Sequence, residues 1–350
     1  MNPALTGRTI FWLTLAAALG VAARVPSIRK RLLPRRTERR NASRILTEDA
    51  LKQVHESEYR GYPATLQSLA GALSIRADRA TSLVAAMEAD GLIHLDGEAI
   101  RPTEVGREYA RRVLRAHRLW ERHLADETGV SHAAWHQEAE RQEHALTPAQ
   151  TDALAARLGH PRYDPHGDPI PTASGVVPSP GAVVPLNAMP PGRPARVVHV
   201  EDEPLAVYTK VSEAGLFAGQ ELMVIEATRE RVRFLVEGEE RALAPVHAAN
   251  VGVEEVPTGE RFDAGVPTER LSRLEPGESA EVLALSRACR GLERRRLMDL
   301  GILPGTSIEA VLRSPSGDPT AYRVRGATIA LRREQADLIR VRRPATSSTS

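Results

Sequence analysis

The chain has 350 residues, with 47 Lys or Arg against 45 Asp or Glu, so its formal net charge is only +2 at pH 7. This length allows two to four domains, and a hydrophobic content of 42% is sufficient for globular cores. The single cysteine, Cys289, excludes an internal disulfide framework and fits a reducing compartment. The near-neutral total hides a basic run, because residues 24–44 contain nine Arg or Lys and one acid. Such a run suits a solvated tail, a phosphate-binding arm or a membrane flank.

An uncharged stretch, TIFWLTLAAALGVAA, runs from Thr9 to Ala23. A membrane-spanning helix needs about 20 apolar residues, so this stretch is long enough only if Arg8 and the residues before it snorkel at the interface. A cleaved signal peptide is the alternative, but here the basic residues follow the apolar segment. By the positive-inside rule we predict a single-pass protein of the cell membrane, with its C-terminal domains in the cytoplasm.

The next segment has the element order of a winged helix-turn-helix. The expected elements are a helix over 44–60, a short helix after Thr65, a turn at 74–76, a second helix over 77–89, and a hairpin of 92–95 with 99–101. The predicted DNA contacts are Thr65, Arg76, Arg79, Ser82 and Arg101. The alternative is a winged helix that contacts only protein, because the second helix carries Asp78 and several alanines.

The stretch from His117 to His144 holds five of the eleven histidines. It follows directly on a long helix predicted over 103–128, on which His117 and Glu121 form an i, i+4 pair. On the following helical segment one face carries His136, Glu140, Glu143 and His144. Imidazoles and carboxylates without a thiolate favour Mn²⁺ or Fe²⁺ and tolerate zinc or cobalt. The alternative is a solvated, charged helix face. We predict a metal site.

The C-terminal half contains a proline-rich linker and then a repeat. Ten of the 25 prolines lie between Pro161 and Pro194, and the segment PRYDPHGDPIP within this region is either an additional metal site at His166 or, more simply, a turn-rich stretch. After it, two stretches of about seventy residues each open with a Leu-x-x-x-x-Pro-Gly phrase, at Leu186 and Leu271. Their strand periodicity and glycine-rich turns predict two small β-barrels that act as interaction modules.

Several phrases in the right order resemble the diphtheria-toxin-repressor family of metal-dependent transcription regulators. They are the winged helix, TEVGREYARRVLRAHRLWERHL, EAERQEHAL and HPRYDPHGDPIP, which together cover roughly residues 44–171. The two repeats are similar to FeoA-type, SH3-like domains, most clearly in RRLMDLGILPG. The resemblance therefore implies a multi-domain protein with an α-rich winged helix-turn-helix, a helical dimerisation domain and two all-β SH3-like barrels, to which the sequence adds an N-terminal transmembrane helix. The expected boundaries are 1–43 for the transmembrane helix and flank, 44–103 for the winged helix, 104–171 for metal binding and dimerisation, 172–184 for a linker, 185–256 for the first barrel, 257–270 for a linker and 271–342 for the second barrel.

The resemblance also implies which residues bind metal. The primary site would be Asp49, Glu140, Glu143 and His144, and the ancillary site His117, Glu121 and His136. Asp49 and Glu140 stand where the iron-type branch has methionine and cysteine, so the set resembles the manganese-responsive branch. Lys52 stands where one manganese regulator has a further acid, which puts an identical two-metal cluster in doubt.

These residues predict a metal-dependent, dimeric repressor of metal-homeostasis genes that binds a palindromic operator in double-stranded DNA, with manganese favoured and iron(II) next. In this family metal would tie the first helix to the dimerisation helices and so favour the state that fits two half-sites. The second hypothesis is a metal-sensing cytosolic subunit of a metal-transport permease. A metallohydrolase is disfavoured, because no positioned base in a pocket is evident, and we expect no enzymatic activity.

Overall fold

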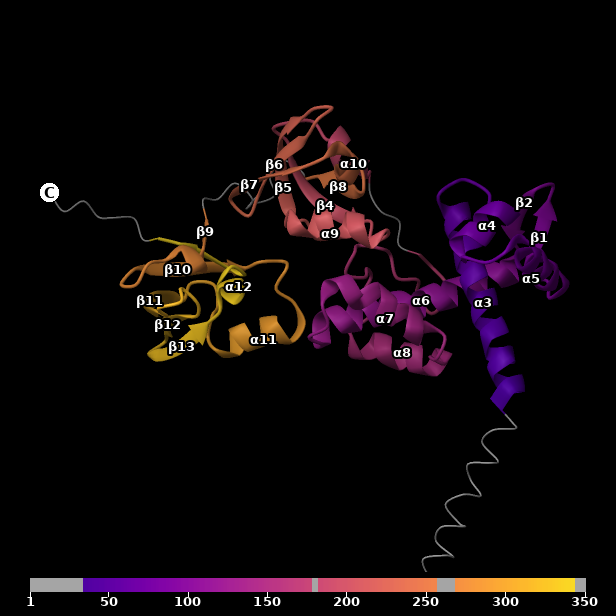
Figure 1. The fold of residues 1–350 in the computed structure, drawn as a ribbon, viewed down its shortest axis with the longest axis horizontal. Coiled ribbons are helices and arrows are strands. Elements are labelled where there is room, and N and C mark those ends of the chain that lie inside the picture. Colours follow the sequence, from indigo (N-terminus) through magenta and orange to yellow (C-terminus); the bar gives the residue numbers. More distant parts are fainter. Residues whose placement is uncertain (1–33, 178–181, 257–267, 344–350) are drawn as a thin grey trace, which may run out of the picture. The chain divides into compact units, whose positions relative to one another are not determined.

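The computed structural model describes residues 34–177, 182–256 and 268–343. The chain divides into two compact units, with the boundary between Arg111 and Arg112 inside one long helix. Each unit is described by itself below (Figure 1).

The first unit consists of helices and one β-hairpin, coloured indigo to purple in Figure 1. Its elements are α3 (Pro34–Tyr59), α4 (Leu66–Ala72), α5 (Ala77–Ala89), β1 (Ile93–Asp96), β2 (Ala99–Pro102) and the start of α6 (Glu104–Glu127). The Thr65 side chain accepts the Ser68 amide and so caps α4, while Ser68 caps it in return. The hairpin turns at Gly97, whose φ of +62° suits glycine. The helix-turn-helix and wing expected from the sequence are therefore confirmed as elements.

The core of this unit forms where α3, α5 and the hairpin bury one apolar face each. Its largest fully buried side chains are Leu51, Leu69, Met87 and Ile93. Thr103 joins the hairpin to α6, because its hydroxyl donates to the Gly91 carbonyl at 2.7 Å and accepts the Gly106 amide at 3.1 Å. The first turn of α6 is thereby held against the backbone that enters β1.

Glycine at position 106 is required by this close packing. A Cβ there would lie 1.9 Å from the Leu92 carbonyl oxygen and 3.4 Å from Leu51 Cδ2. We therefore expect Gly106→Ala to destabilise the protein by about 1–3 kcal/mol, since backbone must move to admit the methyl group. Gly71→Ala is the matched control, because nothing lies within 4 Å of its Cβ position on α4; there we expect a gain of about 0.5–1 kcal/mol. Urea unfolding of both variants measures the difference, and equal stabilities would contradict it.

The second unit begins with a helical part. It contains the rest of α6, the 3₁₀ turn η2 (His132–Ala134), α7 (Trp135–Glu143) and α8 (Pro148–Arg157). Thr147 caps α8 in a reciprocal bond with Gln150, and Pro148 occupies the first turn, where its missing N–H costs nothing. Leu119 of α6 is fully buried against Leu154 of α8 and against Ile170. These contacts fix the face of α6 that points toward α7.

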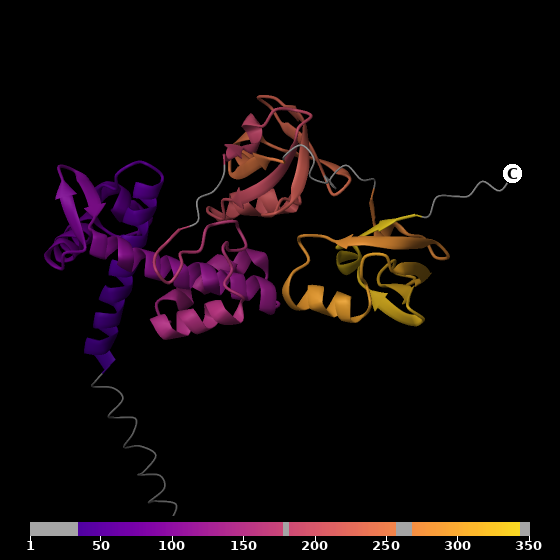
Figure 2. The same ribbon diagram turned by 180° about the vertical axis from the view of Figure 1, so that it is seen from behind.

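Two β domains follow, each with one six-stranded sheet and one nine-residue helix (Figures 1 and 2). The first comprises β3 (Val184–Pro185), η3 (Leu186–Ala188), β4 (Pro194–Val200), α9 (Leu205–Glu213), β5 (Glu221–Ala227), β6 (Val232–Val236), β7 (Glu239–Leu243), α10 (Pro245–Ala248) and β8 (Val251–Glu255). The second comprises β9 (Glu269–Arg270), η4 (Leu271–Arg273), β10 (Ser279–Leu285), α11 (Gly291–Asp299), β11 (Ser307–Arg313), β12 (Thr320–Val324), β13 (Ala327–Leu331), α12 (Arg333–Ala336) and β14 (Ile339–Arg342).

The two sheets have the same topology. The orders β7-β6-β5-β4-β8-β3 and β13-β12-β11-β10-β14-β9 correspond strand for strand, and every pairing is antiparallel. Each sheet closes over its own apolar core, with Phe234 fully buried in the first and Tyr322 in the second. The internal repeat expected from the sequence is thus a repeat of structure.

The predicted transmembrane helix, and with it the predicted single-pass membrane location, is wrong. Over the ranges that the structure describes, no helix combines the length and apolar character needed to cross a bilayer. The segment from Thr9 to Ala23 lies outside the described residues, and its 15 uncharged residues fall short of the roughly 20 that a spanning helix needs.

Candidate metal centre and DNA-binding surface

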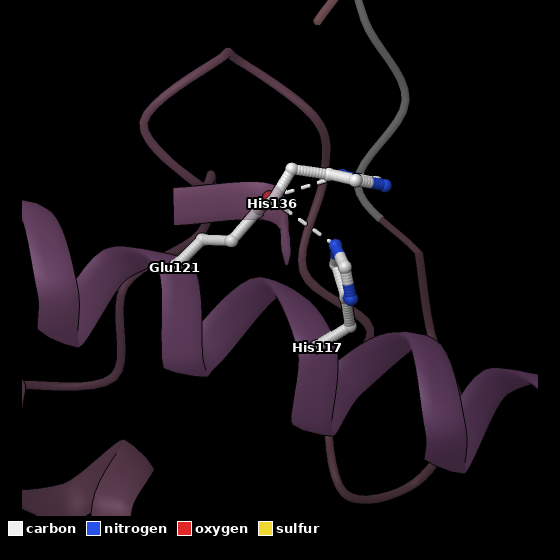
Figure 3. A group of neighbouring side chains, drawn as sticks. All are labelled: His117, Glu121 and His136. Carbon is white, nitrogen blue, oxygen red and sulfur yellow. Dashed lines mark ion pairs between the residues drawn. The ribbon is translucent and has the colours of Figure 1, made fainter. Parts of the chain in front are cut away.

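Helices α6 and α7 bring histidines and carboxylates together in the second unit. His117 and Glu121 lie one turn apart on α6 and are 5% and 1% exposed. His136 lies in the first turn of α7, directly after the buried Trp135. Figure 3 shows both imidazoles directed at the Glu121 carboxylate, one from each helix. The i, i+4 pair on α6 is therefore an inward-facing pair.

Glu121 is the centre of this group. Its Oε1 lies 3.2 Å from His117 Nε2 and 3.4 Å from His136 Nδ1. One ligand atom from each of His117, Glu121 and His136 lies within 4.8 Å of the others, a spacing that could hold a metal ion. The sequence predicted this trio as an ancillary site, and the structure brings the three residues together.

The predicted primary ligands occupy different environments. Glu143 is 4% exposed, joins its carboxylate to His117 Nδ1, and lies 3.4 Å from His144 Nε2. His144 caps the C-terminal end of α7. Glu140 is exposed on α7, with Oε1 3.5 Å from His136 Nε2. Asp49 lies half-buried on α3 in the first unit. The four-ligand set that includes Asp49 stays a prediction.

Two further residues join the cluster. The sequence suggested His166 only as one of two alternatives, a metal site or a turn, and gave no sign of Asp202. His166, 2% exposed, has Nδ1 at 3.6 Å from Glu121 Oε2. Asp202, in the loop after β4, has Oδ2 2.8 Å from His136 Nδ1 and 3.6 Å from His166 Nδ1. Glu121, His166 and Asp202 form a second group with metal-binding spacing. The PRYDPHGDPIP segment is a turn, as expected, but it also places a histidine in the cluster.

The turn that positions His166 is built on Asp164. One carboxylate oxygen of Asp164 accepts the backbone amides of His166, Gly167 and Asp168 at 2.8–2.9 Å. Gly167 has φ of +98° and packs so closely on Val198 that a Cβ would lie 1.8 Å from its carbonyl oxygen. Only glycine fits this position, so the sequence Asp-Pro-His-Gly-Asp fixes the imidazole against the first β domain.

The electrostatics of the cluster are those of cations and anions held close together. Burial by itself raises the pKa of Glu121, but His117, His136 and His166 hold that pKa well below its usual value. Burial lowers the pKa of His136, yet Asp202, Glu121 and other carboxylates raise it far above normal. For His166 the same balance between burial and Glu121 raises the pKa to about 9. These raised pKa values favour the protonated forms of His136 and His166 at neutral pH when no metal is bound.

The geometry fits a divalent cation better than a set of hydrogen bonds. Within the described part of the chain, four buried atoms of this cluster make no hydrogen bond of normal geometry, although three of them lie 2.8–3.6 Å from an oppositely charged group: Glu121 Oε1, His136 Nδ1, and Nδ1 and Nε2 of His166. Buried polar atoms are normally satisfied, so such a group calls for a ligand. Carboxylate oxygen and imidazole nitrogen without sulfur is a donor set suited to Mn²⁺ or Fe²⁺.

The predicted DNA contacts lie on the first unit. Arg76 precedes α5 and pairs with Asp78 at 3.2 Å, both strongly exposed. Arg79 and Ser82 are exposed on α5. Arg101 of β2 pairs with Asp96 across the hairpin at 3.1 Å. Thr65 is half-buried as the cap of α4. The outer face of α5 is thus accessible, and Arg76 and Arg101 would lose at most weak surface pairs on binding a phosphate.

Comparison with known proteins assigns families to these parts. The model for the iron-dependent repressor metal-binding and dimerisation domain matches residues 103–172, and the FeoA domain model matches 184–255 and 269–343. The iron-dependent repressor IdeR of Mycobacterium tuberculosis is 32% identical over 224 residues, covering 60% of this chain and 97% of the relative. The diphtheria toxin repressor of Corynebacterium diphtheriae is 28% identical over 192 residues, covering 51% and 84%. A solved manganese-dependent transcriptional repressor in complex with manganese is 27% identical with a TM-score of 0.55, covering 60% and 100%.

Proposed function

This chain belongs to the iron-dependent repressor family, and on that premise we propose that it is a metal-dependent transcriptional repressor that binds DNA as a homodimer and responds to Mn²⁺ or Fe²⁺. The observation that carries the proposal is the convergence of buried imidazoles and carboxylates from α6 and α7 in a chain that also contains a winged helix. The repressor function of the relatives favours this proposal over a regulatory subunit of a transporter.

We assign the metal ligands to two groups. The primary group is Asp49, Glu140, Glu143 and His144, and the second group is His117, Glu121 and His136 joined by His166 and Asp202. A divalent cation, when bound, supplies positive charge together with fixed coordination directions. Protons on these histidines cannot supply that combination. Glu143 belongs to both neighbourhoods, because its carboxylate contacts His117 as well as His144. Oxygen-rich ligation makes manganese the favoured metal and iron(II) the next.

The regulatory effect follows from where the ligands lie in the chain. Asp49 is on α3, which contributes Leu51 to the core under the winged helix, whereas Glu143 and His144 are on and after α7. Residues from both units must approach one another to share a cation, so the loaded protein has fewer accessible arrangements of its winged helices. Metal can strengthen operator binding only to the extent that it binds the DNA-competent arrangement more tightly than the other arrangements.

A mobility-shift titration tests the function. Full-length protein is mixed with pooled promoter DNA from metal-uptake genes, with and without Mn²⁺, at fixed salt. We expect a shift that requires metal and that Arg79→Gln weakens, because Arg79 lies on the exposed face of α5 where a base or phosphate would be met. Arg193→Gln, an exposed arginine of the first β domain, is the control with the same change of charge.

Absence of a shift with every divalent metal, together with metal binding in calorimetry, would contradict the repressor function. A shift that is equally strong without metal would contradict the regulatory half of the proposal.

A further inference from the structure

The two FeoA domains have the same fold but opposite charge. Residues 184–255 contain 7 Arg or Lys and 12 Asp or Glu, a net charge of −5, whereas residues 269–343 contain 15 and 10, a net charge of +5. Tandem copies of one fold with such different charge are suited to different partners.

The single long helix of each domain also differs in composition, because α11 carries three arginines where α9 has one lysine. Helices α9 and α11 have nine residues each, and both are followed by a glycine with positive φ, Gly215 and Gly301. The seventh residue of each helix, Val211 or Leu297, is buried in its own core. The helices therefore correspond position by position.

At the fourth position the two helices carry different residues. Tyr208 of α9 is 2% exposed and makes ring contacts with His132 and His166 of the helical part, at centroid distances of 5.6 Å and 5.2 Å. The corresponding residue of α11 is Arg294, which is exposed. In the first FeoA domain, this position of the helix packs on the candidate metal centre. In the second FeoA domain, the same position is basic.

Three consecutive arginines, Arg294, Arg295 and Arg296, are exposed on α11. Within the described ranges their guanidinium groups make no hydrogen bond or ion pair, even with Glu293 and Asp299 on the same helix. Arg325 lies at the C-terminal end of α11, because a Cβ on Gly301 would meet its side chain at 3.0–3.7 Å, and it too is exposed without an ion pair in the same ranges.

Several other arginines of this domain are paired. Arg323 pairs with Glu309, Arg342 with Glu281, and Arg343 with Glu269 and Glu278. Arg287, Arg332 and Arg333 are likewise exposed without an ion pair in the described ranges, but Arg294, Arg295, Arg296 and Arg325 belong to α11 and its C-terminal end, and we name these four the α11 surface (α11 is labelled in Figure 1). Guanidinium groups are well matched to phosphate oxygens, which they bind through paired hydrogen bonds.

We propose that the α11 surface binds the phosphate backbone of double-stranded DNA and adds contacts beyond those of the winged helix. This inference rests on the proposed repressor function, because a protein already held on DNA meets phosphates at high local concentration. The contacts carry no sequence information, so they raise affinity and its salt dependence without changing the operator.

The test compares salt dependence in full-length, manganese-loaded protein. The variant replaces Arg294, Arg295 and Arg296 by glutamine, and the matched control replaces the paired Arg323, Arg342 and Arg343 by glutamine, so both lose three positive charges. Binding to mixed-sequence linear duplex DNA is measured by fluorescence anisotropy between low and moderate salt. We expect the slope of log K against log salt to fall by about 2–3 in the α11 variant and affinity at low salt to drop about tenfold or more. The control slope should stay near that of the wild type.

Equal slopes in wild type and α11 variant would overturn the inference, as would equal losses in variant and control, which would mean that only net charge matters. An unchanged slope with loss of self-association in sedimentation would assign the α11 surface to an acidic FeoA domain of a second copy instead. If wild type shifts promoter DNA only with metal and the α11 variant behaves identically in every assay, this inference fails while the proposed repressor function stands. If wild type binds no DNA, the proposed function fails and the inference with it.

Discussion

Replacing Glu143 by glutamine should abolish metal-dependent DNA binding. The side chain is buried, contacts His117 Nδ1 and lies 3.4 Å from His144 Nε2, so it is the carboxylate shared by the two groups of candidate ligands. Glutamine keeps the volume but removes the negative charge and one acceptor. Because loss of an outer-shell partner alone costs about 10–100-fold in metal affinity, loss of a direct ligand should cost roughly 100-fold or more. Calorimetry with Mn²⁺ and the mobility shift measure the two losses.

Glu138→Gln is the matched control for this prediction. Glu138 lies on the same helix and pairs with Arg141 at the surface, so its substitution changes charge equally without touching the cluster. Stability separates a missing ligand from a misfolded helix. A metal that binds only the folded state raises Tm, so wild type and the control should show a Mn²⁺-induced rise that the Glu143 variant lacks. A variant with normal metal-free Tm and a full metal-induced rise would show that Glu143 is not a ligand.

Periodicity allowed the helical part of the site to be predicted. An i, i+4 pair such as His117 and Glu121 has one geometry on a helix, and burial of Leu119 and Leu124 fixes which way that helix faces. His136 could be placed for the same reason, since it opens a helix whose Trp135 and Ala139 are buried. Local spacing is sufficient when ligands and core residues share an element.

The rest of the cluster depends on contacts that no local pattern contains. His166 comes from a turn whose shape is set by the Asp164 carboxylate, and Asp202 from a loop of the first FeoA domain. Both approach Glu121 only because that domain packs on the helical part through Tyr208. The signal present in the sequence was Gly167 between His166 and Asp168, which marks a left-handed turn rather than an extended linker.

The membrane prediction failed for a different physical reason. Apolar composition and flanking arginines suggest an anchor, but the uncharged run has only 15 residues, and length is the stricter requirement for spanning a bilayer. The basic residues around Arg40 and Arg44 instead precede or lie within α3, which reaches from Pro34 to Tyr59. A run of arginines next to a short apolar segment therefore does not by itself indicate an anchor.

Glu121→Gln should remove the second group of ligands and destabilise the metal-free protein as well. Its carboxylate is 1% exposed and is the common neighbour of His117, His136 and His166. Without it, protonated histidines are left buried with less opposing charge, and breaking such a buried pair costs about 3 kcal/mol or more. Metal stoichiometry should fall by one ion per chain. Glu127→Gln, at the end of the same helix and paired with His123, should cost at most about 1 kcal/mol.

The stability of the metal-free protein should depend on pH through His166 and Glu121. His166 has a pKa raised to about 9, so its contribution is fully present below its unfolded pKa of about 6.5 and is lost as pH rises toward 9. Glu121 has a lowered pKa, so its contribution is present above the unfolded pKa of about 4.3 and is lost as pH falls through the folded value. Metal-free wild type should therefore be most stable between about pH 4.5 and 6.5, a maximum that Glu121→Gln flattens.

The substitution Asp202→Asn distinguishes the contribution of this cluster to metal binding from its contribution to the stability of the metal-free protein. Asp202 is 2.8 Å from His136 Nδ1 but lies in a loop, outside the packing of α6 and α7. Its substitution should lower metal affinity of the second group and reduce the stability maximum less than Glu121→Gln does, because Glu121 still opposes the histidines. Urea unfolding across pH, with and without Mn²⁺, measures both effects. A Glu121→Gln protein that keeps the wild-type pH profile would show that the histidines are neutral in the metal-free state, and the cluster would then be preformed for metal rather than held together by its own charges.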